Sequence, residues 1–181
     1  MQQRVIVAHG EEGSGLDQSN ANCDQAGGDQ ALGLDDLDVL ENLLSFYVRS
    51  VNYALSTDLD ARLDGLEVAR GTGKITALLL IDSHPGIRPS AIAKVTLRDR
   101  PAMTRTIAPM VAAGLIEQRV SQRERRATEL FVTPRGHDVA EQVRAIAREQ
   151  SNDFFSVLAS EDREHLLRIL RQLYQTIRVQ Q

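Results

Sequence analysis

The order of elements in the middle of the chain constrains its fold more than any other feature of the sequence. The run "RPSAIAKV", residues 88–95, predicts a short helix, and "AMTRTIAPMVAAG", residues 102–114, predicts a second helix after a brief break. Two β-prone runs, "LIEQRV" and "TELFV", then bracket "SQRERRA". Two short helices joined by a tight turn are typical of a helix-turn-helix. The β-prone pair predicts a hairpin directly behind it, with the arginines near its tip.

Residues with strong positional preferences mark where these helices begin and end. Asp99 is a typical N-cap residue, and Pro101 fits the first turn of the helix that follows it. Gly114 is a typical residue just past a helix. Thr133 and Pro134 have the chemistry of an N-cap and a first helical position, so they predict the start of another helix behind the hairpin.

Apolar side chains at helical spacing predict longer helices on both sides of this block. The first begins at Asp35 or Asp36 and continues to about Leu59 or Leu63. A second runs through "KITALLLIDSH" with Thr72 as its cap, and its stretch 77–81 is apolar all round, so we expect it to be buried. A long helix follows Pro134, and a last one follows Ser160. The sequence therefore predicts a mainly α fold with a small β-wing.

Charge is unevenly distributed along the chain. The net charge is -4, but residues 71–136 hold 11 Lys and Arg against 5 Asp and Glu, and residues 1–70 hold 4 against 13. A local net charge of +6 is the electrostatic signature of a protein that binds a polyanion, although a charge cluster taken alone is more often a solvated face. Aromatic residues make up 4% of the chain and Trp is absent, which disfavours stacking on single-stranded nucleic acid.

The start of the chain predicts a flexible acidic tail over residues 1–33, because it is rich in Gly, Asp, Gln, Asn and Ser and poor in large apolar residues. We find no signal peptide and no apolar run of the roughly 18 residues that a membrane span needs. The one cysteine, Cys23, fits a reducing compartment. We therefore expect a cytoplasmic protein without a membrane partner.

The sequence does not predict an enzyme or a cofactor. "GTGKIT", residues 71–76, partly matches a phosphate-binding loop, but Val68 stands where the first Gly is needed and Ile75 where the metal-binding hydroxyl is needed. Asp82 with His84, or His137 with Asp138, could form part of a ligand site, but such pairs are more often surface residues. We expect no metal site, because the histidines and the cysteine share no ligand spacing: His9, His84, His137, His165 and Cys23.

The block over residues 88–136 resembles the winged helix-turn-helix of the MarR family of bacterial transcription regulators. "SAIA" opens the first helix of the motif, "MTRTI" lies in the recognition helix, "GLI" leads into the wing, and "RERR" stands at the wing tip ahead of "TPRG". The likeness covers roughly residues 34–178. It implies a helical dimerisation region over residues 34–70 and 134–178, and a DNA-binding head over residues 71–133.

The resemblance also implies a homodimer that binds a pseudo-palindromic operator in double-stranded DNA, most often as a repressor. Glu124 stands where the family has an Asp that orients a wing arginine, and Pro109 lies inside the recognition helix, where we expect a kink near Arg105 or Ala108, or less regular pairing. The side chains expected at base edges, phosphates or the minor groove are Arg98, Arg100, Thr104, Arg105, Ser121, Arg123, Arg125 and Arg126.

A small aromatic or phenolic effector is the ligand class that the resemblance implies for switching. Placement alone suggests four lining residues, although each residue type at such a position is more often an ordinary packing or surface residue: Tyr47, Arg49, Tyr53 and His84. Redox switching through Cys23 is disfavoured, since no Lys or Arg lies close in sequence to lower the pKa of its thiol. The alternative to a DNA-binding regulator is a protein-interaction adaptor that has lost DNA binding.

Overall fold

The computed structural model describes residues 33, 37–121, 124 and 127–180. The chain divides into two compact units, residues 1–43 and residues 44–181. Almost all of the predicted tail, residues 1–33, lies outside the described part. In the first unit the described structure is a single 3-10 helix, η2 (Asp38–Asn42). The winged arrangement belongs entirely to the second unit.

The prediction of one long helix from Asp35 or Asp36 is wrong in its start. The α-helix α1 runs over Leu44–Arg62 and is separated from η2 by Leu43, whose backbone is extended with φ -99° and ψ 106°. Asp38 has a φ of 52°, which also lies outside the helical region. Apolar spacing continues across this break from Leu40 to Leu44, so periodicity alone could not reveal it.

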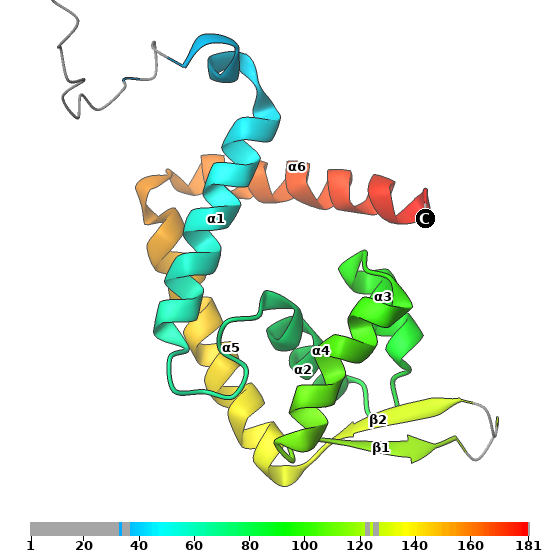
Figure 1. Ribbon diagram of the computed structural model, residues 1–181. Coiled ribbons are helices and arrows are strands. Elements are labelled where there is room, and N and C mark those ends of the chain that lie inside the picture. The colour runs from blue at the N-terminus through cyan, green and yellow to red at the C-terminus, as the bar shows by residue number, and fades with distance from the viewer. Residues whose placement is uncertain (1–32, 34–36, 122–123, 125–126, 181) are drawn as a thin grey trace, which may run out of the picture. The chain divides into compact units, whose positions relative to one another are not determined.

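The second unit contains six α-helices, a two-stranded sheet and one 3-10 helix among the described residues (Figure 1). After α1, the elements are α2 (Thr72–Ser83), α3 (Pro89–Thr96), α4 (Arg100–Ala112), β1 (Ile116–Val120), β2 (Thr128–Val132), α5 (Pro134–Phe154), η3 (Phe155–Val157) and α6 (Ser160–Val179). This order confirms the predicted mainly α fold with a β-wing.

The predicted helix ends at the wing are confirmed by their hydrogen bonds. The Asp99 carboxylate accepts from the amide of Ala102 at 2.7 Å, and the Thr133 hydroxyl accepts from the amide of Gly136 at 3.0 Å. Gly114 has a φ of 70° and donates to the carbonyl of Val111, which is a typical glycine end to a helix. The capping role expected of Thr72 is wrong, because the N-cap position of α2 is Gly71.

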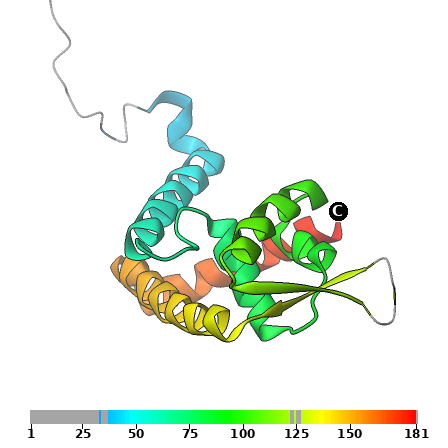
Figure 2. The ribbon, with the colours of Figure 1, turned by 60° about the horizontal axis from the view of Figure 1, so that its bottom comes forward.

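Strands β1 and β2 form an antiparallel hairpin in which Ile116 pairs with Val132 and Val120 pairs with Thr128. Ile87, ahead of α3, adds an isolated bridge to Leu130 of β2. Figure 2 shows the hairpin projecting from the helices beside it. The bridge fixes the base of the wing to the start of the helix-turn-helix.

The core lies where α2 meets α4, α5 and the base of the wing. Ala77, Leu78 and Ile81 are buried as expected, whereas Leu79 and Leu80 are half-buried. The other large, fully buried side chains come from the loop before α2, from α3, α4 and the hairpin, and from α5: Leu63, Val68, Ile92, Met103, Ile107, Met110, Leu115, Ile116, Leu130 and Val143. This core holds the head and α5 in one packed body.

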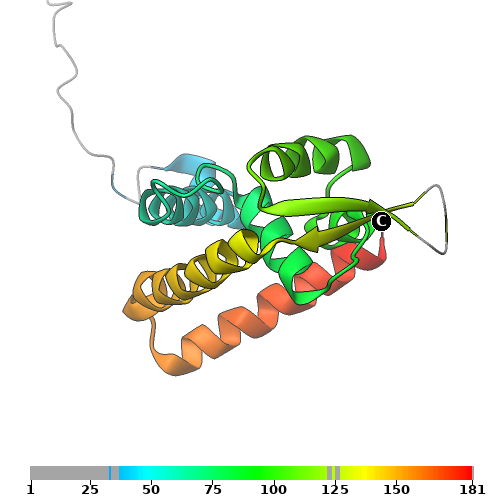
Figure 3. The ribbon, with the colours of Figure 1, turned by 90° about the horizontal axis from the view of Figure 1, so that it is seen from below.

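Helix α6 contributes no buried residue to that core. It starts just after η3 and diverges from α5 (Figure 3). Its second half approaches α3, where the Tyr174 hydroxyl donates to the backbone oxygen of Val95 at 2.8 Å. No helix in the described ranges is both long enough and apolar enough to span a bilayer.

Candidate nucleic-acid interface

Helix α4 is positioned by one buried stripe and presents the opposite face to solvent. Met103, Ile107 and Met110 are at most 1% exposed and face the core. Pro101, Arg105 and Ala108 lie on the opposite side and are exposed. Because a helix of roughly 10–12 Å diameter fits the DNA major groove, this outward stripe has the place of a reading face.

The four predicted contact residues around α4 are exposed: Arg98, Arg100, Thr104 and Arg105. Thr104 donates to the backbone oxygen of Arg100 at 3.1 Å, which leaves the lone pairs of its hydroxyl available as acceptors. Arg98 lies in the turn before α4, directly after Leu97, whose φ is 54°. These groups surround the N-terminal half of α4, the half that enters the groove first in helix-turn-helix complexes.

Pro109 does not end the recognition helix. The helix continues to Ala112, and the carbonyl of Pro109 accepts from the amide of Ala113 at 2.9 Å. The residue is exposed, so its ring lies away from the buried stripe. It also lies beyond Arg105, and the N-terminal half of α4 keeps its cap and its exposed face.

The wing residues divide into described and undescribed positions. Arg123, Arg125 and Arg126 lie outside the described residues. Ser121 is 2% exposed and its amide donates to the carbonyl of Ala127 at 2.8 Å, so the structure places Ser121 inside the hairpin end rather than on a DNA-facing surface. The strand pairing ends at this point. The sequence pattern gave no sign that this short polar side chain would be buried.

Glu124 pairs with an arginine that sequence reasoning did not single out. Its Oε2 lies 2.7 Å from Nη1 of Arg88, the N-cap residue of α3. The family pattern led us to expect a partner for Glu124 within the wing tip itself. Since the bridge of Ile87 to Leu130 brings residue 88 to the hairpin, only the fold could reveal this partner.

Strand β1 of the wing also carries a cationic side chain with two defined partners. The guanidinium of Arg119 lies 4.4 Å from the ring centroid of Phe131 and 2.8 Å from Oε2 of Glu117. The aromatic face and the carboxylate both stabilise the positive charge. Arg119 thus adds to the cations of the head, and its role in the hairpin is first of all structural.

The four suggested effector residues have different surroundings. Tyr47 lines an apolar groove of about 610 Å³ between α1, η3 and α6. The residues lining that groove do not include Arg49, Tyr53 or His84. Tyr53 is 74% exposed, and Nδ1 of His84 lies 2.9 Å from the Ser83 hydroxyl at the end of α2. Of the four suggested residues, Tyr47 alone lines this groove, and effector binding by the set stays a prediction.

A charged cluster joins α2 to α5. It pairs Asp82 with His137, whereas the sequence suggested Asp82 with His84, or His137 with Asp138. Asp82, whose side chain is 5% exposed, lies 2.8 Å from Nδ1 of His137 and also accepts from Arg144. Burial raises the pKa of Asp82, but the hydrogen bonds from His137 and Arg144 outweigh burial and lower it. The hydrogen bond to Asp82 raises the pKa of His137.

This cluster resembles a metal site in its ligand types but not in its charge balance. Atoms of Asp82, His137 and Glu141 lie within 4.8 Å of one another. Arg144 donates to both carboxylates, so its guanidinium already occupies the cationic position. The arrangement is therefore an ion-pair clamp between the head and α5.

Comparison with known proteins supports the resemblance seen in the sequence. Residues 66–127 match the model of the MarR family, which consists of transcription regulators rather than enzymes. The curated "Putative transcriptional regulatory protein for hcr operon" of Thauera aromatica is 29% identical over 97 residues, which cover 54% of this chain and 58% of that protein. The chain thus spans little more than half the length of this relative.

Solved structures of the same fold include a DNA complex and a ligand complex. The transcriptional repressor CouR bound to a 23-mer DNA duplex has a TM-score of 0.68 and 20% identity, covering 74% of this chain and 94% of its own. A MarR family protein of Mycobacterium tuberculosis in complex with p-aminosalicylic acid has a TM-score of 0.57 and 19% identity, covering 72% and 98%. At these identities the likeness establishes the winged-helix fold.

Proposed function

We propose that this protein represses transcription by binding a pseudo-palindromic DNA site as a homodimer, a function supported by the match of its residues 66–127 to the model of the MarR family of transcription regulators. The observation that carries the proposal is the exposed face of α4. Arg100, Thr104 and Arg105 are solvent-exposed on a helix whose opposite stripe is buried. An arginine fork matches the guanine edge or a phosphate, and a threonine can contact either base type.

Exposed apolar side chains on the helices outside the head support a dimer. Solvent-exposed apolar residues line α1 and α6: Leu44, Val48 and Val51 on α1, and Leu167, Ile169, Leu170, Leu173 and Ile177 on α6. The apolar groove beside Leu166 and Leu170 adds to this surface. Monomeric proteins rarely leave large apolar patches in water, and a second copy of the chain would cover these side chains.

Two heads held by such a dimer would read half-sites about one helical turn of DNA apart. A shift in the spacing of the heads would then change the affinity for the operator. We propose that a small aromatic or phenolic effector causes the shift by binding the dimer more tightly in the spacing that does not fit DNA. The ligand complex of the Mycobacterium tuberculosis relative supports this class of effector.

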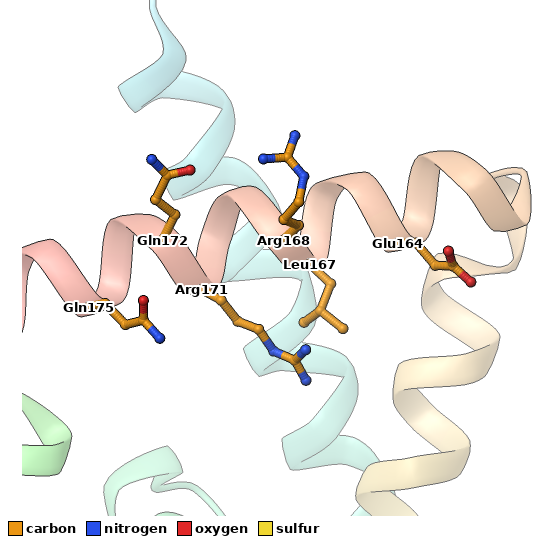
Figure 4. A pocket seen from close by; sticks show the side chains of 6 residues that line it. All are labelled: Glu164, Leu167, Arg168, Arg171, Gln172 and Gln175. Atoms are coloured by element: carbon orange, nitrogen blue, oxygen red, sulfur yellow. The ribbon is translucent and has the colours of Figure 1, made fainter.

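The experiment that tests DNA binding is fluorescence anisotropy with the duplex upstream of the protein's own gene and with a random duplex. We compare wild type with Arg100→Ala/Arg105→Ala. The matched control is Arg168→Ala/Arg171→Ala, which removes the same charge from α6, a helix outside the head; Figure 4 shows these two side chains on α6 beside Glu164, Leu167, Gln172 and Gln175.

We expect tight, site-selective binding by wild type and by the control, and a loss of selectivity in the α4 variant. Each lost bidentate base contact costs about 1–3 kcal/mol of discrimination. Sedimentation of both variants checks that the dimer survives. Equal and weak binding of wild type to both duplexes would instead favour the alternative, a protein-interaction adaptor that has lost DNA binding.

A further inference from the structure

A basic groove lies on the flank of α4, beside the proposed reading face. It has a volume of about 340 Å³ and is lined by the start of α2, the turn before α4 and one side of α4. Three of its lining residues are cations: Lys74, Arg98 and Arg105. None of the residues that line it is acidic.

Two glycines allow the cations to lie across the start of α2. An ideal Cβ at Gly73 would lie 3.1 Å from Cζ and Nη1 of Arg98, and one at Gly71 would lie 2.6 Å from Cε of Lys74. The Arg98 guanidinium thus lies so close to Gly73 that any larger residue there would contact it tightly. The glycines of the "GTGK" run, which fails as a nucleotide-binding loop, thus leave room for two cations.

Donors in the groove remain available for a ligand. Within the described residues, the guanidinium groups of Arg98 and Arg105 make no hydrogen bond and no ion pair. The Lys74 ammonium donates to the backbone oxygens of Ala69 at 2.9 Å and Glu67 at 3.3 Å. Because an ammonium has three protons, one of them is left over.

The position of the groove points to the ligand. Ala102, Thr106 and Pro109 form one flank of α4 and line the groove, whereas Pro101, Arg105 and Ala108 form the neighbouring outward stripe. A helix seated in the major groove has a phosphate backbone on either side of it. With the outward stripe against the bases, the basic groove faces one of these two backbones.

We propose that Lys74 and Arg98 form a phosphate-binding site that clamps one backbone phosphodiester of the operator beside α4. This inference rests on the proposed DNA-binding function. The ligand chemistry is that of a phosphoryl oxygen anion, which a free phosphate compound could also supply. A phosphodiester of bound DNA is favoured because the groove adjoins the reading face and because Arg105 belongs to both.

The test measures the salt dependence of binding for wild type, Lys74→Gln/Arg98→Gln and the control Arg168→Gln/Arg171→Gln, on operator and random duplexes. Losing one phosphate contact lowers the slope of log affinity against log salt by about 0.9, hence by about 1.8 for the two heads of a dimer. Between 50 and 200 mM salt the groove variant should therefore lose about tenfold less affinity than wild type. Both duplexes should be affected alike, because a phosphate carries no sequence.

A second variant separates binding from folding. Gly73→Ala places a methyl group against the Arg98 guanidinium but improves helix propensity, so thermal stability should hold or rise while affinity for both duplexes falls. Inorganic pyrophosphate, added to the free protein in a thermal-shift assay, probes the other source of the anion.

Each outcome decides the proposal. A reduced salt slope in the groove variant, with the control unchanged, supports the clamp. Equal slopes for groove variant, control and wild type overturn it, even though site-selective binding by wild type would still uphold the proposed function. Stabilisation by pyrophosphate together with unchanged DNA slopes also overturns it, and assigns the groove to a free phosphate compound. Wild type without any salt-dependent binding would refute the proposed function itself.

Discussion

Replacement of Gly136 by alanine should destabilise the protein, although the same change usually favours a helix. Gly136 lies in the first turn of α5 and is buried. An ideal Cβ there would lie 2.0 Å from the backbone oxygen of Leu115 and 2.8 Å from Cγ2 of Val132. Real Cβ atoms essentially never come closer than 3.0 Å to such neighbours. The chain must therefore shift by roughly 1 Å, and the obstacle is backbone rather than a flexible side chain.

The magnitude follows from what the shift disturbs. The Leu115 oxygen accepts from the amide of Thr133 at 3.0 Å, and the same threonine caps α5 through Gly136. Overpacking costs about 1–3 kcal/mol, and weakening a hydrogen bond adds about 1 kcal/mol. Alanine in a helix returns about 0.5–1 kcal/mol. The net expectation for Gly136→Ala is a loss of about 1–3.5 kcal/mol in the free energy of unfolding.

Urea unfolding followed by circular dichroism measures this loss at one fixed protein concentration, because the stability of a dimer depends on concentration. Gly73→Ala is the matched control: it is the same substitution in the first turn of α2, but its nearest neighbour is the flexible Arg98 side chain at 3.1 Å. Its stability should stay equal or rise by up to about 1 kcal/mol. A Gly136→Ala protein within about 0.5 kcal/mol of wild type would refute the reasoning.

Three further predictions concern the ion pairs of Asp82, the dimer and the recognition helix. His137→Gln should lower the free energy of unfolding at about pH 5.5 and leave it nearly unchanged at about pH 8.5. The pKa of His137 is raised in the folded protein, so the protonated imidazole stabilises the fold below the unfolded pKa of 6.5, and this gain is lost as the pH rises through the folded pKa. Urea midpoints that shift equally at the two pH values would contradict this. Leu170→Glu, in the apolar groove, should convert dimer to monomer in sedimentation velocity, and an intact dimer would exclude α6 from the interface. Asp99→Ala should cost about 1 kcal/mol in urea unfolding by removing the cap on α4, whereas Asp99→Asn should cost much less, and equal losses would argue against a capping role.

Local chemistry decided the parts of the fold that could be predicted from sequence. The cap at Asp99, the cap at Thr133 and the glycine end at Gly114 depend on hydrogen bonds within a few residues of chain, so residue type was enough. The winged-helix order followed from apolar spacing and turn residues, whereas the contact residues around α4 were expected from the resemblance to the MarR family. The break at Leu43 was missed, because apolar spacing continues through a backbone that is not helical.

What only the tertiary structure decided depends on residues that are distant in the sequence. Asp82 pairs with His137 across α2 and α5, and Glu124 pairs with Arg88 through a bridge at the base of the wing. Gly136 is required because the backbone of Leu115 lies close to it, and helix propensities give no sign of this contact. Sequence patterns report periodicity and local hydrogen bonding, whereas these contacts are set by the packing of one element against another. The sequence by itself therefore determined the elements and their order. The packing determined which charged residues form ion pairs and where a glycine is required.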